Sequence, residues 1–278
     1  MIESVAIVGT GLIGASVGLA LRRAGFAGEI IGIDTRDSEI QTAVGLGAVS
    51  RQGTFDDATR CNVVLLAVPV LAIMDWMRRL VPMMGPQQLI TDVGSTKLEI
   101  SKLGQALSHD STVRILPGHP MAGKELGGAA LGEGAMLEGA MWLFTPIAED
   151  TAIEVEWRSW VQKFGCRTMD MDALQHDKLC AWVSHLPQMV STAMAALFED
   201  EFGDAEEITA VGGRALREMT RLGASPYSMW RDVAMTNTDA VAATLFALEQ
   251  RLAHIRENLK TPELRDEFSL ANAFRARR

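Results

Sequence analysis

The chain has 278 residues, 48% of them hydrophobic, and a formal net charge of −9 at pH 7. This length suits two domains with buried cores, and the acidic balance without any basic stretch argues against nucleic acid as a partner. Cys61, Cys166 and Cys180 are isolated and lack metal-ligand spacing. We therefore expect reduced thiols and no bound metal in a cytoplasmic protein. The acidic amino terminus MIES gives no sign of a signal peptide.

The first element is an apolar strand that runs into a glycine-rich turn, VAIVGTGLIG. In a dinucleotide site the first glycine allows a tight turn, the second lets the backbone approach the pyrophosphate, and the third lets the helix pack on the strand. The helix expected from Leu12 to Ala24 would direct its N-terminus at the phosphates. The sequence therefore predicts a dinucleotide site made by Gly9, Gly11, Leu12, Ile13 and Gly14.

Asp34 ends the next apolar run, IIGID. A carboxylate at this place accepts hydrogen bonds from the ribose hydroxyls of NAD and repels the extra phosphate of NADP. Arg36 follows two residues later and could tolerate that phosphate, so we expect NAD and leave NADP open. A helix N-cap or turn role for Asp34 is the alternative.

Strands and helices alternate through the first half in the doubly wound manner. Several strands are unbroken apolar runs, which suits a parallel sheet covered on both faces. The predicted strands are Ser4–Gly9, Glu29–Asp34, Asn62–Val68, Gln88–Asp92, Val113–Pro117, Met141–Thr145 and Cys166–Asp170. The predicted helices are Leu12–Ala24, Ser38–Leu46, Leu71–Val81, Lys97–Leu107 and Ala152–Phe164.

From about Asp172 onward the pattern predicts only helices: Ala173–Phe198, Asp204–Leu222, Met229–Leu259 and Pro262–Ala276. We expect an α/β protein: a Rossmann-type parallel-sheet domain over residues 1–172, then an all-helical domain over residues 173–278. Leu179–Phe198 carries no charged residue, but its polar side chains favour a buried interface helix over a membrane span. The surplus of apolar helix predicts a homodimer formed through the helical domain.

Ligands bind beyond the carboxyl ends of the strands in such a sheet. Val68 and Pro69 follow one predicted strand, Ser95 follows the next, and His119 follows a third in the segment PGHPMAG. A histidine on a stiff loop, with a pKa near the operating pH, suits a proton acceptor. A structural histidine that caps a turn is the alternative.

Two polar groups stand out in the helical half. Ser184 to Gln188 read SHLPQ, with His176 and Asp177 upstream, and such groups are often satisfied core or interface residues. Arg214, Arg217, Glu218 and Arg221 share one predicted helix face. This face is either solvated, with internal ion pairs, or an anion clamp, and the shortage of positive charge elsewhere favours the clamp.

These pieces occur in a recognisable order: GTGLIG, DVGSTK, GHPMAGKE, HD followed by SHLPQ, and MTRLGASPYSMWRD. Together they resemble the prephenate and arogenate dehydrogenase family of tyrosine biosynthesis, over nearly the whole chain. The resemblance implies NAD-dependent oxidative decarboxylation of a small anionic substrate, prephenate or arogenate, to 4-hydroxyphenylpyruvate or tyrosine. It also implies a dimer built on the helical domain.

The resemblance assigns roles to five residues. His119 matches the histidine that binds the ring hydroxyl and accepts its proton, and Ser95 matches a serine that orients this histidine and the nicotinamide. Arg221 matches the arginine that pairs with the ring carboxylate. Glu125 matches a gating acid, and Glu218 takes the place of an acid that partners this gate.

Ser184 and Gln188 fall where the family contacts the side chain of the substrate. Many prephenate-using relatives carry a second histidine at the position of Gln188. Many also carry an acidic residue where Ser225 and Pro226 stand. These differences concern the choice between a keto and an amino side chain, so the sequence leaves prephenate and arogenate open.

Two rival functions fit parts of the pattern. A β-hydroxyacid dehydrogenase shares the two-domain plan but uses a lysine on a helix of its second domain, where this chain offers only Lys178 and Lys260. A non-catalytic dinucleotide sensor would bind cofactor and a partner only. The GHPMAG segment and the expected convergence of histidine, serine and arginine disfavour both.

Overall fold

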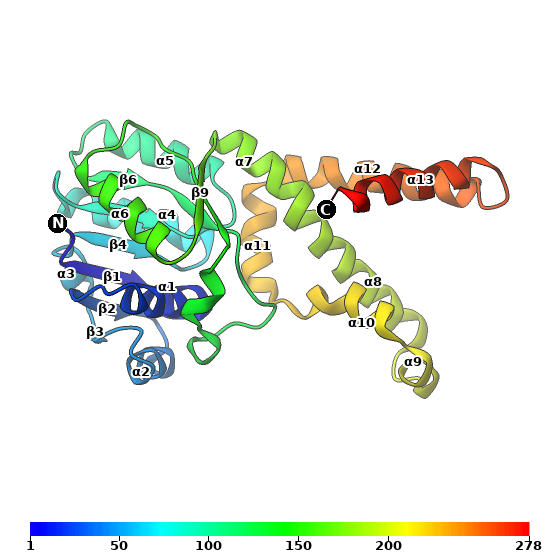
Figure 1. The fold of residues 1–278 in the computed structure, drawn as a ribbon, viewed down its shortest axis with the longest axis horizontal. Coiled ribbons are helices and arrows are strands. Elements are labelled where there is room, and N and C mark those ends of the chain that lie inside the picture. Colours follow the sequence, from blue (N-terminus) through cyan, green and yellow to red (C-terminus); the bar gives the residue numbers. More distant parts are fainter. Residues whose placement is uncertain (278) are drawn as a thin grey trace.

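The computed structural model describes residues 1–277, and its N-terminal half is built on a six-stranded parallel sheet in the order β3-β2-β1-β4-β5-β6 (Figure 1). The strand order reverses between β1 and β4, which opens a crevice at the carboxyl ends of these strands. The predicted doubly wound sheet is confirmed. Its strands are β1 (Ser4–Val8), β2 (Glu29–Ile33), β3 (Arg51–Gln52), β4 (Val63–Leu66), β5 (Leu89–Asp92) and β6 (Arg114–Leu116).

Apolar cores lie on both faces of this sheet. Alternate residues of one strand serve the two cores: Ile7 packs on one side and Val8 on the other. This double burial explains why the strands are unbroken apolar runs rather than alternating ones. The surrounding helices are α1 (Leu12–Arg23), α2 (Asp37–Gly45), α3 (Phe55–Ala58), α4 (Val70–Leu80), α5 (Leu98–Ser108) and α6 (Ala152–Lys163).

A second, three-stranded sheet corrects the sequence-based assignment of the last strands. It contains β7 (Gly118–Pro120), β8 (Met141–Phe144) and β9 (Arg167–Asp170), in that order. β7 runs antiparallel to β8, so the segments predicted at Met141–Thr145 and Cys166–Asp170 do not extend the large sheet. The prolines and glycines of PGHPMAG indicate a loop, but Gly118–Pro120 forms a strand because β8 provides a pairing edge.

The second half is helical throughout the described residues 173–277, as predicted, but its helices are shorter. A π-helical turn at Ala181–His185 interrupts the first one just before Pro187, which lacks an N–H to continue regular hydrogen bonding. Gly212 and Gly213 break the second. The helices are α7 (Ala173–Cys180), α8 (Leu186–Phe202), α9 (Glu206–Val211), α10 (Arg214–Thr220), α11 (Tyr227–Thr236), α12 (Thr238–Glu257) and α13 (Glu263–Ala276).

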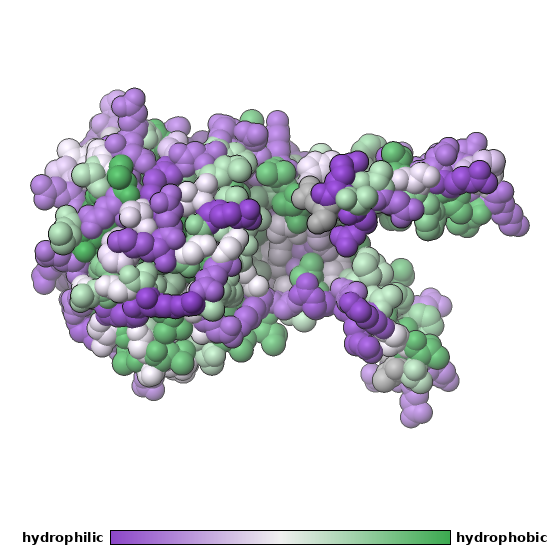
Figure 2. Space-filling view, viewed as in Figure 1, coloured by the Kyte–Doolittle hydropathy of each residue, from purple (hydrophilic) through white to green (hydrophobic). Residues whose placement is uncertain are grey.

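Figure 1 shows two helical arms that diverge from the N-terminal half, one formed by α8 to α10 and the other by α12 and α13. Apolar residues lie exposed along both arms, as the green surface in Figure 2 illustrates. Among residues 1–277, no helix combines the length and the apolar character needed to cross a bilayer.

Polar contacts join the helical half to the strand ends. Asp177 on α7 accepts hydrogen bonds from the backbone N–H groups of Lys97 and Leu98, at 2.7 and 3.0 Å. Asp232 on α11 accepts one from Leu71 at 3.1 Å. The helical half is therefore fixed against the edge where a bound ligand would lie.

Candidate active site

The turn after β1 has the geometry that a dinucleotide needs. Gly9 adopts a φ of +91°, and a Cβ there would lie 2.2 Å from the Ala67 carbonyl oxygen. A Cβ at Gly14 would lie 1.9 Å from the Gly9 oxygen, whereas one at Gly11 would meet nothing within 4 Å. The fold thus requires glycine at the outer two positions. The middle glycine faces open space that the pyrophosphate of a dinucleotide could occupy.

The N-terminus of α1 is suited to an anion. It begins at Leu12 without a side-chain cap and without an acidic residue in its first turn. The first N–H groups of a helix lack partners within the helix, and the helix dipole makes them attractive to negative charge. Leu12, Ile13 and Gly14 therefore offer a phosphate site. Val68 and Pro69, at the end of the neighbouring β4, flank it, since the Val68 side chain lies against Gly9.

Asp34 stands at the end of β2, half-buried, and is held in place by backbone groups. One carboxylate oxygen accepts from the Thr10 N–H at 2.9 Å, and the other accepts from the Arg36 N–H at 3.0 Å. Its carboxylate is thus fixed beside the glycine turn. Asp34 is not the N-cap of α2, since that position belongs to Arg36, whose guanidinium pairs with Glu39 at 3.2 Å.

His119 lies on β7, paired with Leu143 of β8, rather than on the stiff loop that the sequence suggested. The preceding Gly118 N–H donates to Asp92 at 3.2 Å. The same carboxylate pairs with the fully buried Lys97 ammonium. Asp92 therefore connects the ends of β5 and β7 and sets the position of His119 at the edge of the crevice.

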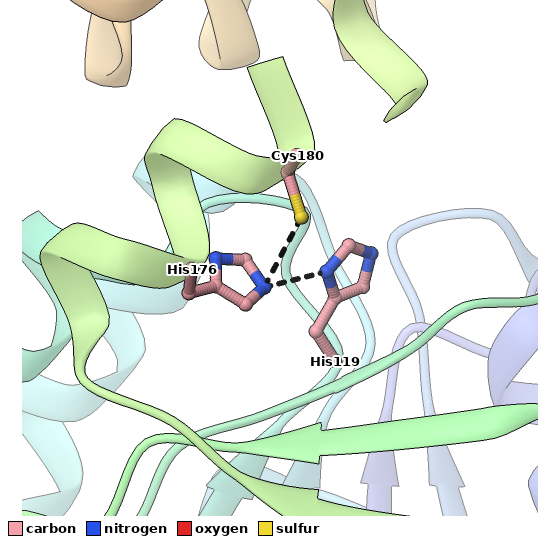
Figure 3. A group of neighbouring side chains, drawn as sticks. All are labelled: His119, His176 and Cys180. Carbon is pink, nitrogen blue, oxygen red and sulfur yellow. Dashed lines mark hydrogen bonds between the residues drawn. The ribbon is translucent and has the colours of Figure 1, made fainter. Parts of the chain in front are cut away.

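His119 faces His176 of α7 (Figure 3). Its Nδ1 lies 2.9 Å from His176 Nε2, and His176 Nδ1 lies 2.8 Å from an oxygen of Asp177. In the described structure no hydrogen bond links His119 to the Ser95 side chain, which is half-buried nearby on the chain after β5. The close partner of His119 is thus a residue of the helical half.

Burial and positive charge keep His119 neutral. Desolvation lowers its pKa well below 6.5, and His176, Lys97 and His185 lower it further. Desolvation also lowers the pKa of His176, against the opposing effect of Asp177. The sequence-based expectation of a pKa near the operating pH is wrong for His119, because the histidine is buried rather than held at a solvated loop.

Cys180 completes the group drawn in Figure 3, with its sulfur 3.5 Å from His176 Nε2. His119, His176 and Cys180 place one ligand atom each within 4.8 Å of one another, so they form the set that could hold a metal. Burial raises the pKa of the Cys180 thiol to about 12. A protonated thiol is a poor ligand, and the His119–His176 hydrogen bond already accounts for the close approach.

Two further donors point to a binding role that the sequence did not reveal. His185 is fully buried and its Nδ1 lies 3.3 Å from the Asn237 amide nitrogen, but its Nε2 has no partner of good hydrogen-bond geometry, although the ring also interacts with the Ser95 backbone. The Trp230 Nε1 also has none, and the two rings lie 5.9 Å apart, edge to face. Because buried donors are usually satisfied, these two suit a ligand acceptor. Ser184 lies half-buried in the same π-helical turn.

The arginine cluster does not form a single face. Arg214 pairs with Glu218 at 2.6 Å on exposed α10, and Arg217 reaches the Gly212 carbonyl. Arg221 lies beyond α10, in a 3₁₀ turn, and pairs with Glu125. Glu125 thus contacts the arginine that the resemblance assigns to substrate, while Glu218 contacts a different arginine.

Gln188 is buried, with its amide already bonded. Its nitrogen donates to Thr192 Oγ1 at 3.1 Å and to the Leu222 carbonyl at 2.7 Å, and its oxygen accepts from Ser225 at 3.2 Å. The expected contact with substrate therefore competes with these bonds. Gln188 connects α8 to the turn that carries Arg221.

Comparison with known proteins agrees with this architecture. Residues 17–168 match the nucleotide-binding domain of prephenate dehydrogenase, and residues 172–275 match its dimerization domain. Prephenate dehydrogenase of Lactococcus lactis is 26% identical over 274 residues, covering 98% of this chain and 75% of the relative.

Solved structures are similar over the full chain. Prephenate dehydrogenase from Aquifex aeolicus, in complex with hydroxyphenyl propionate and NAD+, has a TM-score of 0.84 at 27% identity, covering 99% of this chain and 96% of that one. Synechocystis arogenate dehydrogenase has a TM-score of 0.77 at 26% identity, covering 99% of both chains.

The fold and site define a two-domain oxidoreductase with a nucleotide-binding domain and a helical dimerisation domain. The chain belongs to the prephenate dehydrogenase family. The family resemblance found in the sequence is thereby confirmed, and it disfavours the β-hydroxyacid dehydrogenase and sensor alternatives.

Proposed function

We propose that this protein is an NAD-dependent enzyme that oxidatively decarboxylates prephenate, arogenate or both, giving 4-hydroxyphenylpyruvate or tyrosine. The observation that carries the proposal is a neutral, buried His119 at the crevice between a dinucleotide cradle and the helical half. The relatives named above act on these two substrates, and one of them binds NAD+.

The cradle residues bind the cofactor in this proposal. Gly9, Gly11 and Gly14 hold the pyrophosphate at α1, and Asp34 accepts from the ribose of NAD. A bound nicotinamide would accept the hydride from ring carbon four. The Glu39 carboxylate already pairs with Arg36, which leaves Arg36 less available for the phosphate of NADP.

His119 accepts the ring hydroxyl proton as the hydride leaves, through the Nε2 atom that points away from His176 (Figure 3). Removing this proton forms a ring carbonyl. The bond between the ring and its carboxylate then breaks, carbon dioxide leaves, and the electron pair passes through the ring to the carbonyl oxygen, which takes the proton back from His119 as the phenol forms. A base of low pKa suffices because the hydroxyl becomes acidic while hydride departs. Ser95, after β5, contacts the nicotinamide side of the substrate.

Arg221 positions the anionic substrate. Its planar guanidinium matches a carboxylate in two-point geometry, and Glu125 gives way when the substrate enters. His185 and Trp230 donate to substrate oxygens. Ser184 faces the side chain of the substrate. Glu218 pairs with Arg214 and so offsets part of the positive charge near Arg221.

A homodimer completes the molecule, with residues 1–172 forming the nucleotide-binding domain and residues 173–278 the helical domain. Within the described chain, α13 buries no residue, although Phe268 and Leu270 are large and apolar. A second copy that packs against these helices would cover them.

The test is NAD+ and NADP+ reduction measured in parallel with prephenate and arogenate. We expect NAD+ to be reduced with at least one substrate, and NADP+ less efficiently. Asp34→Ser should reduce the preference for NAD+ over NADP+, because it removes a charge that repels the phosphate of NADP. Binding of NADH without reduction of NAD+ by either substrate would overturn the proposal.

A further inference from the structure

A chain of hydrogen bonds runs from the N-terminus of α5 to His119, through two residues of the helical half. Its links are the backbone of Lys97 and Leu98, the Asp177 carboxylate, the His176 ring and the His119 ring. All three side chains are buried, with His176 and Asp177 at 0% and 1% exposure. Each link fixes which atom carries a proton. The series of hydrogen bonds therefore determines which ring nitrogen of His119 is protonated.

The first link in this series of hydrogen bonds is the Asp177 carboxylate, whose orientation is fixed by two backbone N–H groups. Asp177 Oδ1 accepts from the Lys97 N–H at 2.7 Å, and Oδ2 accepts from the Leu98 N–H at 3.0 Å. These are free donors at the start of α5, and a helix N-terminus also favours negative charge. With both oxygens held, the carboxylate presents Oδ1 to His176 as an acceptor.

The second link fixes the tautomer of His176. Its Nδ1 lies 2.8 Å from Asp177 Oδ1, so this nitrogen carries the proton. Burial lowers the pKa of His176, so the ring is neutral and its Nε2 keeps a lone pair. A histidine whose one nitrogen donates to a carboxylate offers the other nitrogen as an acceptor.

The third link passes this assignment to His119. Because His176 Nε2 is an acceptor, the His119 Nδ1 at 2.9 Å must be the donor. A neutral His119 then carries its only proton on Nδ1 and has a lone pair on Nε2. In Figure 3 this Nε2 points away from His176.

We propose that His176 and Asp177 are positioning residues that hold His119 in the tautomer whose Nε2 can accept the substrate proton. This inference rests on the proposed function, since it assigns how the base of that reaction is prepared. It also explains why a catalytic crevice needs the helical half: α7 sets the protonation state of a residue on β7.

The direct test is the tautomer itself, read from long-range ¹H–¹⁵N correlations of the ring nitrogens in ¹⁵N-histidine-labelled protein saturated with NAD+. The chain has five histidines, so assignment by single substitutions is practicable. We expect His119 and His176 each to carry the proton on Nδ1. A proton on Nε2 of His119 would overturn the inference, whatever the activity of the protein.

Asp177→Asn weakens the first two links. The amide has one oxygen in place of two, so it cannot accept from the Lys97 N–H, the Leu98 N–H and the His176 Nδ1–H together, and the charge that holds the His176 proton on Nδ1 is lost. We expect kcat to fall by roughly 100- to 10,000-fold, the range of a lost general base, with the KM for NAD+ unchanged. The same spectra should show that the protons of His176 and His119 are no longer confined to Nδ1. An unchanged kcat with altered tautomers would contradict the role.

A pair of His176 variants separates positioning from packing. Gln at this position keeps an oxygen near the place of Nε2, whereas Leu keeps the volume without an acceptor. We expect His176→Gln to retain kcat within about 10-fold and His176→Leu to lose roughly 100-fold, at equal substrate KM. Equal kcat values for folded Gln and Leu variants would contradict the inference.

Cys180→Ala is the matched control, since Cys180 is as buried as His176 and makes a weak S–H contact with the same nitrogen, but contacts neither Asp177 nor the His119 ring through a hydrogen bond. We expect its kcat to stay within a few-fold of the unmodified protein. If the unmodified protein reduces NAD+ with neither substrate, the proposed function fails, while the spectra still decide the tautomers.

Discussion

The two halves of the molecule bury their apolar residues very differently. The nucleotide-binding half has two closed cores, and all four residues of β4, for example, are buried. In the helical half, α10 and α13 bury no residue, and α8 buries only Gln188 and Ser191 of its seventeen residues. Since apolar burial is the main driving force of folding, a further surface packed against the helical half would stabilise it more than one packed against the first half.

The site is placed where these halves meet. The residues proposed to hold the cofactor belong entirely to the N-terminal half, whereas His176, Asp177 and Arg221 come from the helical half. Cofactor binding should therefore tolerate damage to the helical half, and catalysis should not. The following predictions test this separation.

The largest effect is expected at His119. Its replacement by Asn removes the proton acceptor, so kcat should fall by roughly 100- to 10,000-fold, while NAD+ affinity, set by the glycine turn, should change little. The measurement is steady-state kinetics together with NAD+ titration. Near-normal turnover would transfer the role of base to another histidine.

The pH dependence of the unmodified protein provides a second check on His119. The neutral ring is the active form, so activity is present above its pKa and lost as pH falls through it. Because burial lowers that pKa well below 6.5 in the ligand-free protein, the acid limb of kcat/KM should lie well below pH 6.5 and should be absent from His119→Asn. An acid limb centred at or above pH 6.5 would contradict the burial argument.

Acidic substitutions on the exposed apolar surface of α13 should dissociate the proposed dimer. Phe268 and Leu270 on α13 are 64% and 61% exposed, so Phe268→Asp with Leu270→Asp should convert a dimer to monomers, measured by sedimentation. The matched control is Met83→Asp, at a 62% exposed apolar residue of the nucleotide-binding half, which should leave the mass unchanged. We expect the monomer to bind NAD+ and to lose turnover. A dimer that survives the double substitution would place the interface elsewhere.

The glycine turn separates stability from binding within the first half. Gly9→Ala meets both a φ of +91° and the Ala67 oxygen, so it should cost about 1–3 kcal/mol of folding free energy and lower the Tm. Gly11→Ala has open space for its Cβ and should leave Tm unchanged while weakening NAD+ binding about 10-fold or more. Equal NAD+ affinity in Gly11→Ala would show that the pyrophosphate does not approach this turn.

The sequence predicts the first half well because its signals are local. A strand, three glycines and a helix follow one another within twenty residues, and double burial makes each strand an apolar run. β7 escaped prediction because Gly118–Pro120 forms a strand only through pairing with β8. The His119–His176 contact spans 57 residues and leaves no periodic pattern, so only the packing of α7 against the strand ends reveals it.

The smallest effect concerns Gln188, where the sequence and the structure give different expectations. The resemblance puts Gln188 beside the substrate side chain, so Gln188→His should change the ratio of kcat/KM for prephenate and arogenate. The hydrogen bonds instead make Gln188 the tie between α8 and the turn of Arg221, through Leu222 and Ser225.

Gln188→Leu distinguishes the two expectations. It leaves the Leu222 carbonyl and the Ser225 hydroxyl without their partner, a loss of about 1–2 kcal/mol that loosens the Arg221 turn. The KM for both substrates should then rise together, by roughly 5- to 30-fold, with kcat and NAD+ affinity nearly constant. Thr192→Val, which removes one weaker bond of the same amide, should have a smaller effect in the same direction. A changed ratio of kcat/KM for prephenate and arogenate, without a rise in KM for both, would instead indicate that Gln188 contacts the substrate side chain. A loosened Arg221 would affect both substrates alike, because it cannot discriminate between their side chains.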